Sequence, residues 1–335
     1  MEDSDPKVSI IIPVKNGESV IGDLLDSLMN LDYDPEKLEI IVVDGKSVDR
    51  TRDIAAMYPV KVVSEEGSGL NAARNTGIRY SRGEVVAFID ADCVAPREWI
   101  RKVVKNFEDE RVGCTGGNVR AFGDDFFSLY ADHSLIPVMP FLKKRMILDG
   151  LKPFRYPAGC NMAFRREAII KAGYFDEEIH YGFDDLEFIE RVGKAGYNIA
   201  LDPDVLVLHK HRTTLLGLLR QMFRYGRGGG IVLRRRGLST SLSRWLFLCV
   251  LIFFSCIFLV TSLVALYLLL HNPIFYYVLL GLVLASLSIS MGYYALKGPR
   301  RGRVTAVIVY PFIDLLRCIV FCVGEVYQLV RGRKT

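Results

Sequence analysis

The stretch VVAFIDAD, residues 85–92, decides how this chain folds. Its first five residues are an apolar run of strand length that is rich in β-branched side chains. Three similar runs precede it, and segments with helical spacing of apolar residues lie between them. Short apolar strands that alternate with helices predict a parallel sheet covered on both faces. The other strand-like runs are residues 8–14, 38–43 and 60–63, and the helical segments are 20–29, 50–57 and 69–80.

Two carboxylates follow the strand at 85–89 directly. Asp90 and Asp92 stand one residue apart at the end of a parallel strand, where open α/β sheets bind ligands. Hard oxygen donors at this spacing suit Mg²⁺ or Mn²⁺ bridging a diphosphate, and such an ion neutralises the charge on a departing diphosphate. A D-x-D also occurs as a solvated turn, so this interpretation depends on the strand before it.

Further polar side chains follow the other predicted strands. Asp44 closes the second strand, and its carboxylate suits hydrogen bonds from a nucleobase or a ribose. The alternative role of such a carboxylate is a helix N-cap, which Asp49 fits better. Residues 13–18 form a turn-rich loop on the same side of the sheet. Residues 67–75 contain Arg74 at a glycine-led helix start, but their spacing fits neither a Walker loop nor a dinucleotide fingerprint.

Composition divides the chain into a charged front and an apolar back. Of 335 residues, 50% are hydrophobic and 24% are charged, which excludes disordered, collagen-like and low-complexity proteins. The charge of the front also excludes a pure membrane channel. The acidic N-terminus lacks the apolar core of a signal peptide, so we expect the front domain to be made and kept in the cytosol.

The seven cysteines favour a reducing compartment. Their number is odd and no C-x-x-C pair occurs, so their spacing indicates no disulfide framework, zinc site or redox motif. Four of them lie in the apolar back, where they read as small hydrophobic residues. These four are Cys249, Cys256, Cys318 and Cys322.

Three apolar stretches in the back are candidates to cross a membrane. Residues 245–270 and 274–296 hold no charge, and a bilayer core needs about 20 apolar residues in a helix. Residues 304–330 are a weaker candidate because they include two acids, an arginine and a proline. Asp314 and Arg317 stand three residues apart and could pair on one helix face. A third span therefore competes with a re-entrant or interfacial helix.

Basic residues around these stretches predict their orientation. Arginines precede the first stretch and basic residues fill the loop 297–303, whereas the link 271–273 has none. The positive-inside rule then places the front domain and that loop in the cytosol. The tail residues Arg331, Arg333 and Lys334 fall on the opposite side if the third stretch spans, which favours the re-entrant alternative.

The segment 213–244 joins the two halves. It mixes leucines and aromatic residues with arginines, which fits a basic amphipathic helix on an anionic membrane surface. An ordinary packed surface helix is the alternative. We therefore expect a cytosolic α/β domain at 1–212, this interfacial segment, and a membrane domain at 245–335 with about three helices.

Six motifs in this order resemble the family 2 nucleotide-sugar glycosyltransferases. They read VSIIIPVKNGE, VVDGKSVDRT, GLNAARNTGI, VVAFIDADC, GCNMAFRRE and FDDLEF. The resemblance covers about residues 7–230 and implies the GT-A fold, a Rossmann-like, mostly parallel α/β domain. With QMFRY at 221–225 and the apolar stretches, the chain looks like a small cellulose-synthase-like membrane glycosyltransferase. Its Q-x-x-R-W motif is matched except that Tyr225 replaces Trp, and Tyr retains the ability to stack.

The resemblance implies roles for the matched residues. Asp185 would be the general base that takes a proton from an acceptor hydroxyl, and Asp184 stands where the family has Glu. The alternative for this pair is favourable charge at a helix N-terminus. The donor would contact Pro13, Glu18, Asp44, Arg74, Asp90, Gln221 and Arg224. The acceptor side would include Gly159, Asn161 and Tyr225.

The same resemblance implies a metal site and a lipid-linked acceptor. Asp92, Asp90 and His211 would hold Mn²⁺ or Mg²⁺, although isolated histidines are more often structural. Three spans are half of the channel in polymer-extruding relatives, so we expect a polyprenyl- or dolichyl-phosphate-linked acceptor. We expect a GDP- or UDP-sugar donor, with GDP-mannose favoured by analogy with lipid-linked glycan assembly such as that of N-glycans. The remaining expected partner is the lipid bilayer, and we expect no nucleic acid.

Three other functions stay open from the sequence. A lipid-phosphate sugar synthase, of the dolichyl-phosphate-mannose or -glucose type, needs no base because its acceptor is already an anion. Asp185 and the Q-x-x-R-Y set favour a hydroxyl acceptor instead. A processive polysaccharide synthase is the second alternative. An inactive membrane scaffold that retains nucleotide binding is the third, and the intact acidic motifs speak against it.

Overall fold

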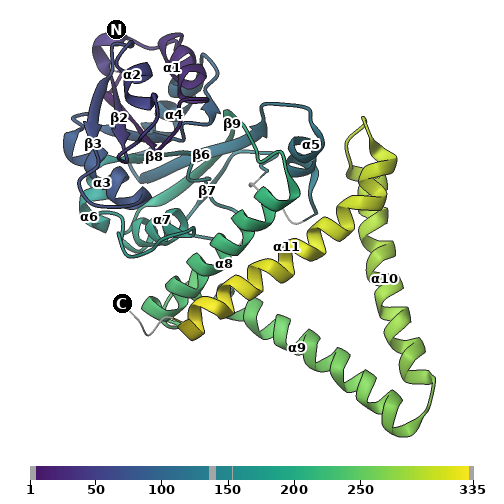
Figure 1. The fold of residues 1–335 in the computed structure, drawn as a ribbon. Helices are drawn as coiled ribbons and strands as arrows, with labels where there is room; N and C mark the ends of the chain where they lie inside the picture. The colour runs from purple at the N-terminus through teal and green to yellow at the C-terminus, as the bar shows by residue number, and fades with distance from the viewer. Residues whose placement is uncertain (1–4, 136–140, 153, 332–335) are drawn as a thin grey trace. The chain divides into compact units, whose positions relative to one another are not determined.

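The computed structural model describes residues 5–135, 141–152 and 154–331, and the chain divides into two compact units (Figure 1). The first unit comprises Met1–Asp124 and Met139–His211, and the second comprises Asp125–Val138 and Arg212–Thr335. The second unit thus includes a segment from within the predicted α/β domain. Arg333 and Lys334, which bear on the predicted orientation, lie outside the described residues.

A mixed sheet forms the centre of the first unit, and the four predicted apolar runs form four of its parallel strands. The strands are β1 (Val8–Val14), β2 (Leu38–Asp44), β3 (Lys61–Ser64), β4 (Val85–Ile89), β5 (Cys93–Val94), β6 (Val112–Ala121), β7 (Met146–Leu148), β8 (Asn161–Arg165) and β9 (Asn198–His209).

The order of these strands is β3-β2-β1-β4-β8-β6-β9-β5, with β7 paired to β9. The first four are parallel to one another. Strand β8 runs antiparallel to both β4 and β6, and β6 runs parallel to β9. The parallel half matches the predicted βαβ units. The other half is mixed because β8 enters the sheet between β4 and β6 in the opposite direction.

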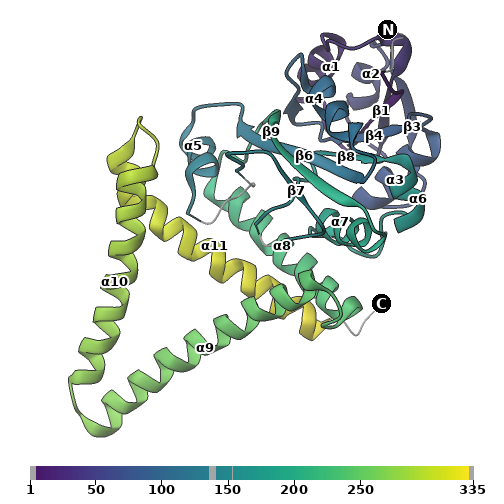
Figure 2. The same ribbon diagram turned by 180° about the vertical axis from the view of Figure 1, so that it is seen from behind.

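Helices cover both faces of the sheet, as Figures 1 and 2 show. Ile10 and Ile12 of β1 belong to a core shared with α1, α2 and α4, whereas Ile11 belongs to one shared with α3, α6 and α7. Each buried Ile or Leu side chain contributes about 1.5–3 kcal/mol to stability, so both faces favour apolar residues. The helices are α1 (Ile21–Met29), α2 (Thr51–Ala55), α3 (Leu70–Tyr80), α4 (Trp99–Lys105), α6 (Arg166–Ala172) and α7 (Asp184–Lys194).

The described part of the second unit is helical. Its three longest helices are long and apolar enough to cross a membrane, with mean hydropathy of 2.8, 2.1 and 2.2 for α9, α10 and α11. Each contains one of the three predicted stretches. In both views they form an open triangle, and α8 runs beside α11 (Figures 1 and 2). The helices are α5 (Phe126–His133), α8 (Leu215–Arg236), α9 (Ser241–Leu270), α10 (Ile274–Lys297) and α11 (Arg303–Arg331).

The charges of α11 are buried against other helices of the second unit. Asp314 accepts hydrogen bonds from Tyr294 and, at 2.5 Å, from the hydroxyl of Tyr130 on α5. Arg317 Nη1 donates to that hydroxyl at 2.7 Å and lies 3.5 Å from Asp314 Oδ1. The predicted pairing of Asp314 with Arg317 is therefore present. Helix α11 runs unbroken through Pro311, so no break marks a re-entrant turn in it.

Glycines allow α8 and α11 to approach closely. A Cβ added to Gly226 of α8 would lie 2.0 Å from the carbonyl oxygen of Phe321, and one added to Gly324 of α11 would lie 2.4 Å from that of Phe223. Real Cβ atoms do not come this close to another atom. Small residues at helix crossings permit backbone-to-backbone packing of this kind in membrane proteins.

Candidate active site

Strand direction gathers the polar residues of the first unit at one edge of the sheet. Asp44 ends β2, and Asp90 follows β4, which is parallel to it. Strand β8 runs the other way, so its first residue, Asn161, pairs with Ile89. Strand β9 brings His209 to the same edge. Ligands of open α/β sheets bind at this carboxyl end of the parallel strands.

Asp90, Asp92 and His209 form the tightest polar group at this edge. One possible ligand atom from each residue lies within 4.8 Å of the other two. Asp92 Oδ1 is 3.3 Å from His209 Nε2, and the backbone N–H of Lys210 donates to the Asp92 carbonyl at 2.8 Å. Two carboxylates and one imidazole are donors that Mg²⁺ or Mn²⁺ accepts.

The electrostatics of this group favour a bound cation. Burial raises the pKa of Asp90, and the charge of Asp92 raises it further. Burial by itself would lower the pKa of His209, but the hydrogen bond to Asp92 and nearby acidic groups raise it to about 9. The raised pKa of His209 keeps a proton on its imidazole near neutral pH, which a divalent cation would replace, and the charge that Asp90 and Asp92 place close together is one that such a cation would neutralise. The three residues therefore fit a divalent metal ion.

His209 is the member of this group that the sequence reasoning did not select. The predicted ligand was His211, whose ring centroid lies 4.7 Å from that of His209. In β9, Val205, Val207 and His209 alternate on the buried face, whereas His211 follows the end of the strand. The period of two along β9 could have identified His209. The role of His211 stays a prediction.

The second pair of acids begins α7. Asp184 is 7% exposed and bonds to the guanidinium of Arg74, which is 2% exposed. Arg74 Nη2 also lies 3.5 Å from the carbonyl oxygen of Gly159, toward which it donates. A Cβ added to Gly159 would lie 2.9 Å from both Arg74 Nη2 and Asp185 Oδ2. The glycine therefore leaves room for Arg74 and for both carboxylates.

The two members of this pair differ in their surroundings. Asp184 has a full positive charge beside it, whereas burial and the neighbouring charge of Asp184 raise the pKa of Asp185 to about 7. A carboxylate with this pKa is matched to proton transfer near neutral pH. Arg74 and Asp184 also act electrostatically on Asp90, so the two acid pairs lie within range of each other.

The backbone before α7 is strained. Tyr181, Gly182 and Phe183 have φ values of 76°, 140° and 64°, a region that side chains other than glycine rarely adopt. Tyr181 and Phe183, which are not glycine, each cost about 1–3 kcal/mol in this region, and such residues cluster at functional sites. The strain sets the direction in which Asp184 and Asp185 leave the loop.

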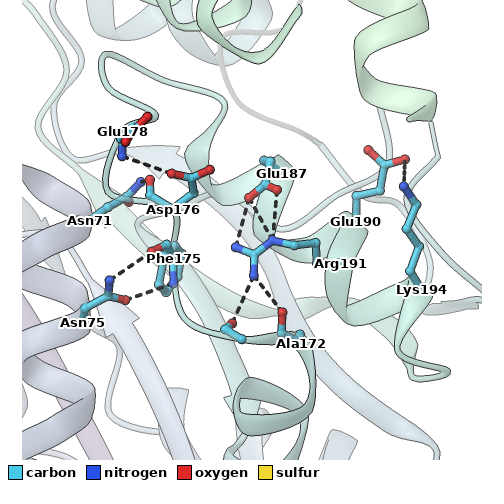
Figure 3. A network of polar contacts seen from close by, with 11 residues as sticks. Asn71, Asn75, Ala172, Phe175, Asp176, Glu178, Glu187, Glu190, Arg191 and Lys194 are labelled. Carbon is cyan, nitrogen blue, oxygen red and sulfur yellow. Dashed lines mark hydrogen bonds and ion pairs between the residues drawn. The ribbon is translucent and has the colours of Figure 1, made fainter. Parts of the chain in front are cut away.

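A polar network holds α3 and α7 in place around this loop (Figure 3). Asn75 of α3 donates to the carbonyl oxygen of Phe175 at 2.9 Å and accepts from its N–H at 3.0 Å. Asn71 donates to the carbonyl oxygen of Asp176 at 2.9 Å. Arg191 of α7 bonds to Glu187 at 2.9 Å and to the carbonyl oxygen of Ala172 at 2.8 Å. These bonds fix the helices that carry Arg74 and the acid pair.

Hydrogen bonds connect the loops that would receive the donor's nucleoside. Asp44 is 2% exposed and lies 3.2 Å from Arg52 Nη1. Glu18 Oε2 accepts from the N–H of Arg50 at 3.0 Å, and the N–H of Asn16 donates to Ser47 Oγ at 2.8 Å. The loops after β1 and β2 are thereby held together. The nucleoside contacts of Pro13, Glu18 and Asp44 stay predictions.

Asn161 is engaged within the core of the first unit. Its side chain accepts from Trp99 Nε1 and donates to the carbonyl oxygens of Asn118 and Val205, all at 2.9 Å. It is fully buried. These contacts give Asn161 a framework role, and its predicted acceptor contact stays a prediction, as does a donor contact by Arg74.

Gln221, Arg224 and Tyr225 share one face of α8, in the second unit. Gln221 Nε2 donates to Tyr225 Oη at 2.9 Å, and Arg224 is exposed. Residues three and four apart lie on the same side of a helix. Their predicted contacts with the donor and the acceptor stay predictions.

Comparison with known proteins identifies relatives and a fold. Residues 9–173 match the model of glycosyl transferase family 2. Glycosyltransferase AglE of Haloferax volcanii is 29% identical over 67% of this chain and 73% of its own length. The beta-monoglucosyldiacylglycerol synthase of Synechocystis is 25% identical over 67% of this chain and 48% of its own length. The match thus spans about half of that synthase.

A solved structure agrees with the fold over nearly the whole chain. It is that of mannosyltransferase PcManGT from Pyrobaculum calidifontis in complex with GDP-Man and Mn²⁺, and it aligns with a TM-score of 0.58 and 22% identity. The alignment covers 99% of this chain and 89% of that one. At this identity the likeness shows the GT-A-like fold. With the family match and the named relatives, it follows that residues 9–173 form a glycosyltransferase family 2 domain and that the chain is a nucleotide-sugar glycosyltransferase.

Proposed function

We propose that the chain is a metal-dependent, inverting glycosyltransferase that moves mannose from GDP-mannose to a hydroxyl of a polyprenyl- or dolichyl-phosphate-linked acceptor. The observation that carries this proposal is the arrangement of two acid pairs at one sheet edge, one beside His209 and one beside Arg74. Three helices that are apolar enough to cross a membrane support a lipid-held acceptor. The front domain is proposed to face the cytosol, with residues 213–244 on the membrane surface.

In this mechanism the residues of the first unit have separate roles. Asp90, Asp92 and His209 would hold Mn²⁺ or Mg²⁺, which supplies positive charge against the diphosphate leaving group. Asp185 accepts the proton of the acceptor hydroxyl as its oxygen attacks the anomeric carbon. Asp184 and Arg74 flank that carboxylate, which accepts a hydrogen bond from the N–H of Leu186 at 2.8 Å. A single displacement of this kind inverts the configuration at the anomeric carbon.

The donor and metal rest on likeness to other proteins. The PcManGT structure is a complex with GDP-Man and Mn²⁺, and the name of the synthase relative indicates a lipid product. These favour a nucleotide-mannose donor and a lipid-borne acceptor for this chain. The exposed Arg224 and the partly buried Gln221 are proposed to grip the donor diphosphate.

Transfer assays with the full chain in detergent test this proposal. Radiolabelled GDP-mannose, UDP-glucose and UDP-GlcNAc are offered with Mn²⁺ and with three acceptors, namely a polyprenyl-diphosphate-linked saccharide, polyprenyl phosphate and diacylglycerol. We expect GDP-mannose and the lipid-linked saccharide to give most product, with inverted configuration by NMR. Nucleotide binding without transfer to any acceptor would contradict the proposal and support an inactive scaffold.

The variant Asp185→Asn separates the two lipid-linked reactions. A hydroxyl acceptor needs a base, whereas polyprenyl phosphate is already an anion. We expect the variant to lose transfer to the saccharide. Wild-type transfer to polyprenyl phosphate that survives in Asp185→Asn would instead indicate a lipid-phosphate sugar synthase, and a lengthening polymer would indicate a processive synthase.

A further inference from the structure

Two buried thiols lie directly behind the Asp90–Asp92–His209 cluster. Cys93 of β5 and Cys160, which precedes β8, are free cysteines with 1% and 3% of their surface exposed. One possible ligand atom from each of Cys93, Cys160 and His209 lies within 4.8 Å of the other two. The strands bring together three donors that are far apart in the sequence.

Strand pairing fixes this arrangement. Cys93 and His209 are direct partners in the antiparallel pair of β5 and β9, so their side chains project to the same side. Cys160 stands next to Asn161, which pairs with Ile89 at the end of β4. Two of the three residues are therefore placed by paired strands, and Cys160 is placed by the turn that leads into β8.

The two ring nitrogens of His209 have different surroundings. Its Nε2 lies 3.3 Å from Asp92 Oδ1. Its Nδ1 is buried and has no hydrogen-bond partner among the residues that the structure describes. The residue as a whole is 8% exposed. A buried polar atom without a partner is unfavourable unless something binds it.

We propose that Cys93, Cys160 and His209 form a second cation site, selective for a thiophilic ion such as Zn²⁺. Two thiolates and an imidazole are soft and borderline donors that select zinc over magnesium or manganese. Zinc bonds of about 2.3 Å to sulfur and about 2.0–2.1 Å to nitrogen place ligand atoms less than about 4 Å apart, so a small contraction closes the site. Three protein ligands leave a fourth position for water.

The charge balance suits a buried site. When the ion binds, each thiol releases its proton to solvent, and two thiolates then cancel the charge of the dication. The site proposed for Mn²⁺ or Mg²⁺ uses the carboxylates of Asp90 and Asp92 instead, and His209 belongs to both groups. A thiophilic ion on the thiols therefore engages the same imidazole as an ion on Asp90 and Asp92, so occupancy of one site affects the other. The binding itself does not depend on the proposed reaction.

Cadmium titration of the full chain in detergent tests the site. Cd²⁺ serves as the probe because its bond to a thiolate gives a near-ultraviolet charge-transfer absorption, which carboxylates do not produce. The protein is first treated with a chelator and kept reduced with a phosphine. We expect one equivalent of Cd²⁺ to give this absorption and Zn²⁺ to abolish it. Excess Mn²⁺, which can compete for His209 but not for the thiolates, should lower it far less than Zn²⁺ does.

Matched cysteine variants locate the signal. We expect Cys93→Ala/Cys160→Ala to lower the affinity by more than about 100-fold, because losing ligands costs more than losing the groups that orient them. The control Cys249→Ser/Cys256→Ser removes two exposed cysteines of α9 and should titrate like the wild type. The conservative Cys160→Ser and the single His209→Asn variant should each weaken binding, and melting curves confirm that each is folded.

Three results would overturn the proposal. The first is a wild-type chain that gives no cadmium–thiolate absorption. The second is a folded Cys160→Ser or double alanine variant that binds Cd²⁺ as tightly as the wild type. The third is displacement of Cd²⁺ by Mn²⁺ as readily as by Zn²⁺, which would assign the ion to the carboxylates. None of these readouts measures sugar transfer, so they remain distinct from failure of the proposed function.

Discussion

Two pairs of aspartates in the first unit carry the same functional group and have different neighbours. Asp90 and Asp92 are separated by one residue, follow a strand and face His209. Asp184 and Asp185 are adjacent, begin a helix and face Arg74. The donor atoms of the first pair and of His209 lie within 4.8 Å of one another, which suits a cation between them. The second pair already has a positive charge beside it, the guanidinium of Arg74.

This difference is the basis for the two roles that we propose, which are metal binding by the first pair and proton transfer by the second. In the second pair Asp184 forms the ion pair with Arg74. Burial and the negative charge of Asp184 raise the pKa of Asp185 to about 7. In the first pair both carboxylates lie close to His209, and we propose that they share a metal ion. Carboxylates acquire separate roles when their surroundings push their pKa values apart.

The largest expected effect comes from removing the second acid of the first pair. Asp92→Ala should lower kcat/KM for sugar transfer by more than about 10³-fold, because an ion there contributes several kcal/mol against leaving-group charge. Transfer rates and Mn²⁺ binding by calorimetry measure this. Asp53→Ala, an exposed acid of α2, is the control. Full activity of Asp92→Ala without divalent ions would end the metal assignment.

Asp185→Asn should come next. We expect kcat to fall by about 10²-fold or more, in the range for loss of a general base, while Mn²⁺ and donor affinities stay near the wild-type values. Single-turnover kinetics and equilibrium binding of the donor separate the two effects. A loss of donor binding as large as the loss of rate would indicate that Asp185 helps to bind the donor, as proposed for the first pair, and does not act only as a base.

Asp184→Asn should act mainly on stability. It leaves the buried Arg74 without its charge partner, which costs about 3–5 kcal/mol in the free energy of unfolding. Urea unfolding followed by fluorescence measures this cost. The matched control is Glu66→Gln, which breaks the exposed pair with Arg79 and should cost less than about 1 kcal/mol. Equal costs for both variants would show that the buried Arg74–Asp184 pair contributes no more to stability than an exposed ion pair.

The pH dependence sharpens the comparison within the second pair. Asp185 must be deprotonated to act as a base, so the rate should fall about tenfold per pH unit below its pKa of about 7. The pKa in the folded chain exceeds the unfolded value, so stability falls as pH rises from the unfolded pKa through about 7. Asp185→Asn should remove this slope. In Asp184→Asn the rate profile should move to lower pH, and an unmoved profile would contradict coupling between the two acids.

The smallest effect should come from the network behind α3. Asn75→Ala removes hydrogen bonds to Phe175 (Figure 3) and should cost about 1–2 kcal/mol in unfolding free energy. Because it perturbs how α3 presents Arg74, it should lower kcat more than it raises the KM for the donor. A change confined to the donor KM would argue that the network supports the first pair instead.

Much of the site could be predicted because local patterns carried it. The D-x-D after an apolar strand and the paired acids at a helix start follow from residues a few positions apart. His209 was not predicted, since choosing it over His211 requires knowing which of two histidines lies on the buried face of β9. Arg74 was predicted to bind the donor, yet its geometry pairs it with Asp184, and sequence spacing does not reveal a partner 110 residues away.

The amino-acid sequence by itself determined the family, the parallel half of the sheet, the acidic motifs and the three apolar helices, because each depends on short-range periodicity and composition. Only the tertiary structure decided the antiparallel insertion of β8, the sharing of Asp184 with Arg74 and the meeting of Cys93, Cys160 and His209. The cysteine spacing indicated no zinc site, whereas strand pairing places the three donors together. Contacts between distant residues depend on how strands pair, and a pattern of neighbouring residues does not specify which strands pair.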